Sequence, residues 1–490
     1  MILKLKNNKS PGEDRISAEM CKALGELGLR ALLQLVNHVW QEERAPTEWR
    51  RGIIVRIAKK GDLSNCANWR GITLLAVIGK ILSNIIYNRI KEAVFGVISE
   101  EQAGFREGRG CADHIFVLRH IMEQCEEWKK SLVLNFVDFS RAFDSIHRPS
   151  MWKLLKLYGI PDKIVALIKV MFEGSESCVR VGQEHTDWFE VTTGVRQGDV
   201  LSPLLFNIVI DYTMGKLQQI EGGLRWTEKN ILKGLAYADD ICLLGEDTDS
   251  IIVLTDTLNA EAKKLGLNIN THKTKTMKLM TTDERTVTVD GHQLENVDRF
   301  VYLGSTLCED GDVRREVRAR IGKASAAFNG LKNVWSSTGI TRKTKLQLFN
   351  AIVMTVLLYC CESWKGLRDV ELRVRRFESN CLRKIMNIRW FEHISEEQVR
   401  ERSGQKSVTE KIRYNRWRWY GHVLRMPESR LPKQALNWTP VGARRPGRPK
   451  DTWRRTIARD RRERNIDVDV EELAQHRGEW RNFITALWAT

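Results

Sequence analysis

Two adjacent carboxylates, Asp239 and Asp240, lie in the middle of the apolar segment GLAYADDICLLGE (234–246). An unpaired carboxylate is costly to bury, so side chains of this type in such a setting need a cation or a metal ion as a partner. A structural alternative fits equally well, because the apolar flanks can form the two strands of a hairpin with Asp-Asp at its exposed tip. This stretch alone does not distinguish a catalytic pair from a turn.

A third acid follows another apolar segment. SLVLNFVDFS (131–140) is typical of a buried strand and carries Asp138 near its end, 101 residues before Asp239. If that strand lies beside the hairpin, three carboxylates meet at one edge of a sheet. Because like charges raise one another's pKa, such a cluster needs cations to stay ionised. Two Mg²⁺ ions would meet this need, since they prefer carboxylate oxygens and can clamp the attacking and leaving oxygens of a phosphoryl displacement. We expect Asp138 and Asp239 to carry most of the metal binding, because Asp240 alternates with Asp239.

The elements that must position these acids follow from the apolar pattern. Helices are predicted at 17–41, 77–95, 150–172 with a break at 159–161, from 202 onward, and at 250–265. Strands are predicted in 52–62, 131–140, on both sides of the YADD turn, in 268–279 and in 299–307. Ser17 and Ser202 suit helix N-caps, Pro203 suits a first helical turn, and Gly266 suits a helix stop. Beyond about residue 312 only helical patterns remain.

The charge of the chain predicts a polyanionic partner. The 490 residues carry a formal net charge of +17, and residues 365–490 contribute +13 of it, with 30 Lys and Arg against 17 Asp and Glu. Tryptophan, tyrosine and arginine alternate there, as in RYNRWRWYGH (413–422), which favours a nucleic-acid-facing region. The segment RPGRPK (445–450) resembles an AT-hook, although a solvated linker is the competing interpretation.

Several classes of protein are disfavoured. The ten cysteines have no zinc-site spacing and are interpreted as reduced core thiols. No run of 18 apolar residues and no signal peptide is present in the sequence, so we expect an intracellular protein, nuclear or cytoplasmic, without a membrane partner.

Nine sequence blocks together resemble a known family. Five of them occur in the order and spacing of reverse-transcriptase motifs A to E: FVDFSRAFD (136–144), GVRQGDVLSPLLFN (194–207), YADD (237–240), LGLNINTHKTK (265–275) and FVYLG (300–304). Four upstream blocks resemble the finger motifs of non-LTR (LINE-type) retrotransposon polymerases: NNKSPGEDRI (7–16), PTEWRRGIIVRIAKKGD (46–62), NWRGITLL (68–75) and QAGFREGRG (102–110). The resemblance covers about residues 7–305 and extends loosely into the tail.

The resemblance implies an α+β right-hand polymerase that copies RNA into DNA. Its expected parts are fingers with N-terminal helices (1–130), a palm with an antiparallel sheet and motifs A to E (131–311), a helical thumb (312–364) and a basic, mainly helical C-terminal region (365–490). The implied partners are an RNA template, a DNA primer or target DNA, and dNTPs. The implied cofactor is a pair of Mg²⁺ ions, with Mn²⁺ as an alternative. The oligomeric state stays open.

The resemblance also implies roles at the nucleotide site. Asp138, Asp239 and Asp240 match the metal-binding triad, and Lys273 matches a general acid for the leaving pyrophosphate, with Lys275 as the alternative by one alternation. Phe143 matches the steric gate that blocks a 2′-hydroxyl. The remaining nucleotide contacts are backbone amides of Phe139, Ser140, Arg141 and Ala142, the finger cations Lys59, Lys60 and Arg70, and the RQGD residues Gln197 and Gly198.

Template and primer contacts are implied in two further segments. Arg106 and Arg109 of the Gly-rich segment match residues next to template phosphates. Tyr302, Leu303 and Gly304 match the primer-grip hairpin, although a core strand explains them as well.

Two functions from different classes remain open at this stage. The first is an active RNA-directed DNA polymerase, favoured by the intact acids, the gate residue and RQGD. The second is a decayed or domesticated nucleic-acid-binding protein that retains the fold without turnover. The sequence shows no endonuclease or RNase H motif, and Arg56 and Ala58 replace the Pro and aromatic residue common in relatives. We therefore expect a truncated or separately predicted reading frame of an element.

Overall fold

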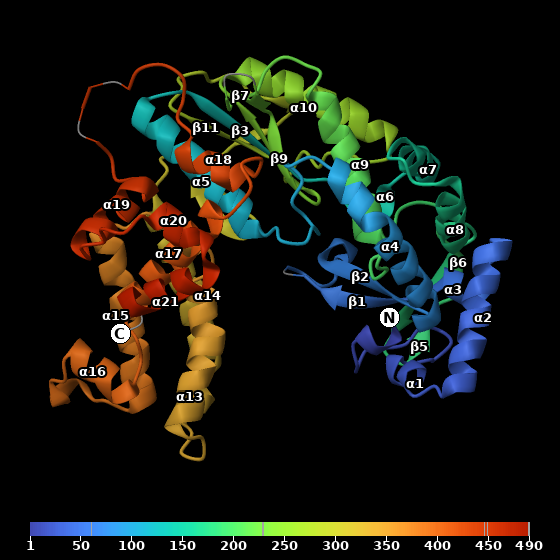
Figure 1. Ribbon diagram of the computed structural model, residues 1–490, viewed down its shortest axis with the longest axis horizontal. Coiled ribbons are helices and arrows are strands. Elements are labelled where there is room, and N and C mark those ends of the chain that lie inside the picture. The colour runs from blue at the N-terminus through green and yellow to red at the C-terminus, as the bar shows by residue number, and fades with distance from the viewer. Residues whose placement is uncertain (60, 228–229, 445, 448, 489–490) are drawn as a thin grey trace.

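The chain forms an arch, with the N-terminal elements on one side, the C-terminal helices on the other and a central sheet joining them (Figure 1). This computed structural model describes residues 1–59, 61–227, 230–444, 446–447 and 449–488. Among these residues, no helix combines the length and apolar character needed to cross a bilayer.

The N-terminal side is built on a five-stranded sheet. Its strands are β1 (Arg51–Ala58), β2 (Trp69–Leu75), β4 (Glu176–Val181), β5 (Glu184–His185) and β6 (Phe189–Glu190). β1 pairs antiparallel with β2 and parallel with β4. The surrounding helices are α1 (Ala18–Lys22), α2 (Glu26–Glu42), α3 (Thr47–Arg50) and α4 (Val77–Val97), with short 3-10 turns η1 (Ile2–Lys4) and η2 (Cys66–Asn68).

The single helix predicted for 17–41 is wrong, because it is divided into α1 and α2. Ser17 caps α1 as expected, since its side chain accepts a hydrogen bond from the Met20 amide. The chain is then extended at Gly25, which begins α2. Arg56 stacks over the Trp69 ring at 5.0 Å, so this departure from the family pattern is accommodated within the β1–β2 pair.

The central sheet has the strand order β14-β11-β3-β10-β9. Its strands are β3 (Leu132–Val137), β9 (Gly234–Tyr237), β10 (Asp240–Gly245), β11 (Lys275–Leu279) and β14 (Glu295–Asn296). β3 lies between β10 and β11 and pairs antiparallel with both. The predicted buried strand and the strand-turn-strand around YADD are therefore confirmed.

Both faces of β3 are buried, which explains its continuous apolar sequence. Val133 and Val137 belong to the larger core, which α9 (Ser202–Leu217) and α10 (Thr248–Lys264) cover. Leu134 and Phe136 belong to a second core on the opposite face, under α5 (Cys111–Trp128). This alternation follows from the two-residue period of a strand.

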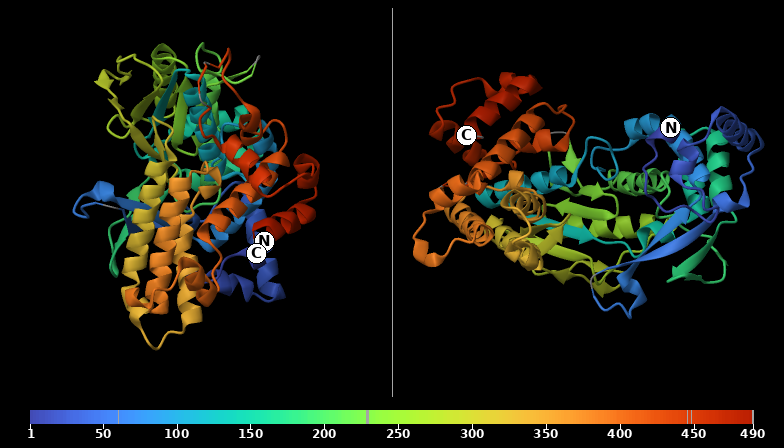
Figure 2. Two further views of the ribbon diagram at one scale, coloured as in Figure 1. Left: turned by 90° about the vertical axis from the view of Figure 1, so that its left-hand side faces the viewer. Right: turned by 90° about the horizontal axis from the view of Figure 1, so that it is seen from below.

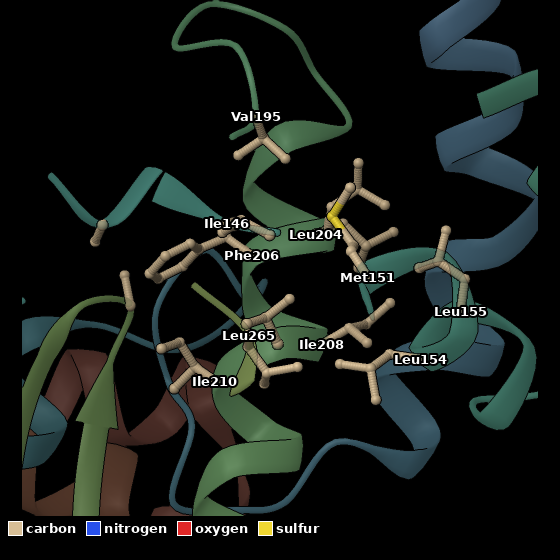
Figure 3. Close-up of a cluster of buried hydrophobic side chains, with 14 of the residues drawn as sticks. Ile146, Met151, Leu154, Leu155, Val195, Leu204, Phe206, Ile208, Ile210 and Leu265 are labelled. Atoms are coloured by element: carbon tan, nitrogen blue, oxygen red, sulfur yellow. The ribbon is translucent and has the colours of Figure 1, made fainter. Parts of the chain in front are cut away.

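The larger core extends from α9 to α7 (Arg148–Leu157) and α8 (Asp162–Phe172), and Figure 3 shows residues from α7 and α9 packed together. The predicted break between α7 and α8 is confirmed. Two predicted helix starts are shifted. Leu201 rather than Ser202 is the N-cap of α9, and α10 begins at Thr248 because the Asp247 side chain accepts from the Ser250 amide at 2.7 Å.

The remaining small elements flank the central sheet. They are α6 (Ala142–Ser145), β7 (Leu224–Arg225), β8 (Ile231–Leu232), β12 (Thr288–Val289), β13 (His292–Gln293), β15 (Arg299–Tyr302) and β16 (Ser305–Cys308). β15 and β16 form a separate antiparallel hairpin.

All described elements after β16 are helical, as predicted, and Figure 2 shows the long helices of this part running side by side. They are α11 (Val313–Gly330), α12 (Lys332–Ser336), α13 (Arg342–Leu348), the π-helix η3 (Phe349–Met354), α14 (Thr355–Leu357), η4 (Cys361–Ser363) and α15 (Arg368–Met386). The chain continues with η5 (Trp390–Glu392), α16 (Glu396–Ser403), α17 (Val408–Leu424), α18 (Leu431–Asn437), α19 (Trp453–Glu463), α20 (Val470–Gln475) and α21 (Arg477–Trp488).

The C-terminal region is docked on α5. Trp453 packs edge-to-face on Phe116 at 5.1 Å, and its backbone amide donates to Glu123 at 2.8 Å. Acidic side chains of α5 pair with basic residues of the tail, including Asp113 with Arg430 at 2.7 Å. Part of the tail's positive charge is therefore neutralised inside the molecule.

In the alternation of Trp and Arg in 413–422, Arg416 and Trp417 pack inside the protein. Trp417 is fully buried in α17, and Arg416 is 1% exposed and paired with Asp460 at 3.1 Å. The expectation of a nucleic-acid-facing segment is wrong for these two residues. In the AT-hook-like RPGRPK segment, Arg445 and Arg448 lie outside the described residues.

Candidate active site

The three acids meet at one end of the central sheet. Asp138 follows the last residue of β3, Asp239 lies in the turn between β9 and β10, and Asp240 begins β10. The register pairs Ile241 with Val137, so Asp240 and Asp138 are each one residue beyond that pair on neighbouring strands. The predicted hairpin tip and the predicted acidic cluster are thus the same feature.

The turn that carries Asp239 has a strained backbone. Ala238 has a φ of +57°, a left-handed conformation that costs free energy for a residue with a Cβ. Gln102 holds this turn, because its Oε1 accepts hydrogen bonds from the amides of Ala238 at 3.1 Å and Gly104 at 2.9 Å. Asn207 on α9 donates to the Gly104 carbonyl at 2.7 Å. The acids are therefore positioned partly by a segment that lies 136 residues earlier in the chain.

Neither Gln102 nor Asn207 was predicted to act at the site. The only sequence signal was the position of QAGF between two finger blocks, and the chemistry of a glutamine does not reveal which backbone it will hold. Gly104 is required by close approach, because a Cβ there would overlap the backbone nitrogen of Ala238.

A lysine lies against the acids. The Lys273 ammonium is 3.3 Å from Asp138 Oδ2, whereas Lys275 points to Glu295 at 2.6 Å. Of these two lysines, Lys273 is therefore the one that pairs with an acid of the candidate site, which favours it over Lys275 for the predicted role. The backbone amide of Asp138 donates to Thr274 Oγ1 at 3.2 Å.

The electrostatics of the site disfavour three ionised carboxylates. Loss of hydration at the hairpin tip, followed by repulsion from Asp239 and Asp138, raises the pKa of Asp240 to about 6. Burial, followed by repulsion from Asp138, also raises the pKa of Asp239, while Arg70 and Lys273 act in the opposite direction. A cation bound here would relieve this repulsion.

The residues present fit a divalent metal. The donors are carboxylate oxygens, which Mg²⁺ prefers. Asp138 Oδ2 is buried and accepts no hydrogen bond from the described residues, although the Lys273 ammonium is 3.3 Å away. In the described part of the chain, however, no three carboxylate, His or Cys side chains are gathered as closely as a formed metal site requires. Lys273 supplies the positive charge at Asp138 in this arrangement.

The segment after Asp138 forms a tight bend next to the acids. Arg141 has a φ of +51° and precedes α6, which gives part of the curvature expected of an anion-binding backbone. The Ser140 amide, however, donates to the Asn268 carbonyl at 2.8 Å. Of the four backbone amides predicted to bind triphosphate, that of Ser140 is therefore already used, and the prediction is wrong for it. Phe139 is buried and bridges to Ile269.

Phe143 is half-buried beside this bend. Its ring stacks on Phe206 of α9 with a centroid distance of 4.4 Å and an interplanar angle of 8°. Phe105 meets it edge-to-face at 6.2 Å. These two contacts fix the orientation of the ring, as a residue that limits access to a sugar would require.

The RQGD turn joins the central sheet to β2. The Gln197 carbonyl accepts from the Thr73 amide at 2.7 Å, and its side chain donates to Asp144 at 3.3 Å. Gly198 has a φ of +131°, and a Cβ there would overlap the Thr73 carbonyl, so only glycine fits. The Gln197 side chain is thus held beside the segment that carries Phe143.

The finger cations lie on the β1–β2 hairpin. Arg70 is exposed on β2 and pairs in register with Ile57, and its charge partly opposes the burial that raises the pKa of Asp239. Lys59 is exposed just after β1, and its backbone amide donates to Asn68 at 2.8 Å. Lys60 lies outside the described residues.

Arg106 and Arg109 are engaged within the protein, and this corrects their assignment to template phosphates. The buried Arg106 guanidinium donates to the backbone carbonyls of Ser99, Gln102 and Phe95. Arg109 forms a two-pronged ion pair with Glu100. We assign both arginines to holding the loop that carries Gln102, because their donors are used by that loop.

The β15–β16 turn is fixed by the helices that follow it. Leu303 and Gly304 both have positive φ, of +46° and +78°. The Leu303 carbonyl accepts from the Tyr359 hydroxyl at 2.9 Å, and the Gly304 carbonyl accepts from Arg320. Tyr302 is buried, and its hydroxyl lies 3.5 Å from the Asp240 carbonyl, so this hairpin touches the strand that carries the acids.

A comparison with protein families identifies the fold. The family model described as reverse transcriptase (RNA-dependent DNA polymerase) matches residues 57–307, more than half of the chain. The chain belongs to the reverse transcriptase family. Its α+β right-hand fold, with a helical C-terminal part and a central sheet that is antiparallel except for the parallel β11–β14 pair, is therefore the one predicted. A second model, for a domain of unknown function, matches residues 327–359.

Similar proteins come from non-LTR retrotransposons, which confirms the predicted resemblance. A 115 kDa protein of the R1DM element of Drosophila melanogaster is 26% identical over 79% of this reverse transcriptase chain and 37% of its own length. An RNA-directed DNA polymerase from the mobile element jockey of Drosophila funebris is 27% identical over 80% of this chain and 43% of its own. A Pol polyprotein of the R2 element of Popillia japonica is 29% identical over 69% and 48%. The chain thus spans less than half of each of these relatives.

A structural comparison matches telomerases. The apo telomerase of Candida Tropicalis aligns with a TM-score of 0.45 and 13% identity, over 84% of this reverse transcriptase chain and 68% of the telomerase chain.

Proposed function

We propose that this chain is an RNA-directed DNA polymerase that joins a dNTP to the 3′-hydroxyl of a primer paired with an RNA template. The observation that carries the proposal is the meeting of Asp138, Asp239 and Asp240 at one end of the central sheet, beside Lys273, in a chain of the reverse transcriptase family. The net charge of +17 supports nucleic-acid partners.

The reaction is a phosphoryl transfer in which the primer 3′-oxygen bonds to the α-phosphorus of the dNTP and the bond to pyrophosphate breaks. Lys273 donates a proton to the leaving pyrophosphate, as its ammonium already lies at the acids. Phe143 excludes a ribose 2′-hydroxyl. Gln197 and the exposed Arg70 orient the nucleotide from the opposite side of the site.

Asp138 and Asp239 are the residues that would hold two Mg²⁺ ions, or Mn²⁺, with Asp240 as a further carboxylate. Bound metal supplies charge neutralisation for the attacking and leaving oxygens. We also propose the division into fingers (1–130), palm (131–311), thumb (312–364) and C-terminal region (365–490), with Tyr302, Leu303 and Gly304 as the primer-contacting turn. The contact between Tyr302 and the Asp240 backbone supports that last role.

The test is primer extension by purified protein on poly(rA)/oligo(dT) with Mg²⁺ and dTTP, with Asp239→Asn beside the wild type. We expect extension by the wild type only, with the affinity for the hybrid unchanged within about twofold, because the substitution removes one charge and keeps the shape. Absence of extension in the wild type, with tight hybrid binding by both proteins, would favour a nucleic-acid-binding protein that retains the fold without turnover.

A further inference from the structure

A pocket of about 640 Å³ lies between the helices after the β15–β16 hairpin and the C-terminal helices, where α14, α17 and α21 are neighbours (Figure 1). It is outside the candidate active site, since none of its lining residues belongs to that site. Its walls come from η3 and the chain that follows it, from α17 and from α21. Met354 and Leu358 give it apolar surface on the η3 side.

One helix face supplies most of its functional groups. Lys411, Tyr414, Asn415 and Arg418 are spaced three or four residues apart on α17, so they share one face of that helix. This face combines an aromatic ring, an amide and two cations. That combination is typical of surfaces that stack a base and hold its phosphate.

The charge of the pocket favours an anion. Three basic residues line it, Lys406, Lys411 and Arg418, and no acidic side chain is among its lining residues in the described part of the chain. The Lys411 ammonium lies 3.8 Å from the buried carboxylate of Glu378, whereas Arg418 is exposed. A phosphate group would therefore meet Arg418 first.

A buried donor in the wall lacks an acceptor. Trp488 of α21 lines the pocket and is 2% exposed, and its indole N–H has no hydrogen-bond partner among the described residues. An unsatisfied buried donor costs free energy, and an acceptor on a ligand in the pocket would remove that cost. Base carbonyls and phosphate oxygens are acceptors of this kind.

The opposite wall is an irregular helix. Phe349–Met354 forms a π-helix, and Asn350 and Met354 of this segment face the pocket. π-Helical segments are rare and frequently occur at functional sites. The wall is also tied to the hairpin near the acids, because Tyr359, next to Leu358, donates to the Leu303 carbonyl.

We propose that this pocket binds an unpaired nucleotide of a single nucleic-acid strand, with the base against Tyr414 and the phosphate at Arg418. The amide nitrogens of Asn350 and Asn415 already donate within the protein, to Gln405 and to Cys361 Sγ, so the proposed contacts are the Tyr414 ring and the Arg418 guanidinium. The occupant is a second nucleic-acid contact, separate from the primer end at the acids. RNA and DNA share the chemistry of base and phosphate that the pocket recognises.

The test is site-resolved crosslinking of the full chain. A single-stranded RNA 12-mer containing 4-thiouridine, and a DNA 12-mer containing 4-thiothymidine, are each irradiated with the protein, and crosslinked peptides are mapped by mass spectrometry. We expect crosslinks in peptides that contain Tyr414 or Trp488. We expect Arg418→Glu and Tyr414→Leu each to lower their yield by about tenfold, the effect of losing one phosphate contact or one stacked ring.

Arg462→Glu is the matched control, because Arg462 is exposed on α19, does not line the pocket and changes the net charge equally. Its crosslink yield should stay within twofold of the wild type. Crosslinks in the pocket with one or both probes support the proposal and show whether the bound strand is RNA, DNA or either. Crosslinks that map only elsewhere, or pocket crosslinks unaffected by Arg418→Glu, overturn it. The assay contains neither dNTP nor metal, so a catalytically inactive chain gives the same result.

Discussion

Replacing Gln102 by alanine removes the side chain that holds the turn carrying Asp239. Its carboxamide oxygen accepts from the Ala238 and Gly104 amides at 3.1 and 2.9 Å, and the residue is 1% exposed. In Gln102→Ala both amides lose their acceptor. The left-handed Ala238 then loses a contact that stabilises it, so the carboxylate of Asp239 is no longer held in place.

The magnitude follows from the two hydrogen bonds. Leaving one buried backbone donor without an acceptor costs about 1–3 kcal/mol, so two cost about 2–6 kcal/mol. Water can enter the space of the removed carboxamide, and we therefore expect a loss of about 2–4 kcal/mol in the free energy of unfolding. If about 1.4 kcal/mol of this loss is felt in the position of the acids, the rate of nucleotide addition falls by about tenfold.

Two measurements separate the effects. Urea unfolding gives the change in stability, and single-nucleotide primer extension under saturating dTTP gives the rate at a temperature where the variant is fully folded. The affinity for the primer–template hybrid is measured by fluorescence anisotropy. This affinity should change by less than about twofold. Gln102 is buried and uncharged, whereas nucleic-acid binding depends mainly on basic side chains at the surface.

Gln124→Ala is the matched control. Gln124 is a buried glutamine of α5, and it takes part in none of the hydrogen bonds that hold the turn. The reasoning is refuted if folded Gln102→Ala extends primers as fast as folded Gln124→Ala, or if its stability equals that of the wild type. The urea-unfolding measurement tests the reasoning even if the chain has no polymerase activity.

Three further predictions concern the acids and their neighbours. Lys273→Ala should lower the rate of nucleotide addition by about 10²-fold, whereas Lys275→Ala should change it little, because only Lys273 contacts an acid of the site. Phe143→Val should lower the preference for dTTP over UTP by at least about tenfold, measured as the ratio of kcat/KM values, since we propose this ring as the gate against a 2′-hydroxyl. Asp240→Asn should raise the melting temperature at pH 7.5 without divalent metal but not at pH 3.5. The fold raises the pKa of Asp240 to about 6 from 3.8, so stability is lost as pH rises through that window, and the neutral amide avoids the loss.

Each of these predictions has a contradicting result. If both lysine variants lose the same fraction of the rate of nucleotide addition, the contact between Lys273 and Asp138 is not the cause. Positive charge near the sheet would then explain the loss. An unchanged nucleotide preference in Phe143→Val, with Phe300→Val as the aromatic control, would remove the gate assignment. An Asp240→Asn variant that is no more stable at pH 7.5 than the wild type would show that neither loss of hydration nor repulsion raises the pKa of Asp240 in the folded chain.

The sequence determined the family, the fold class and the strand and hairpin on which the candidate acids lie. The adjacent acids within an apolar run, the apolar strand that ends at Asp138, and the motif order led to the family and to the hairpin, because these signals are local and periodic. The helix division at Gly25 was not predicted, and the starts of α9 and α10 were predicted one or two residues late. Helix ends are the least certain part of a periodic pattern, because neighbouring residues can begin or end a helix almost equally well.

The tertiary structure alone decided where the charges of the chain point. Arginine is the residue type expected to bind phosphate. In this chain, however, Arg106, Arg109 and Arg416 bind carbonyl and carboxylate groups of the protein itself. The support of the catalytic turn by Gln102 depends on two segments 136 residues apart becoming adjacent. Likewise the pocket between α14, α17 and α21 exists only after the C-terminal helices pack. The spacing of residues in the sequence shows which of them share a face of one helix or strand. Contacts between different elements depend on how those elements pack, so they could not be predicted from the sequence.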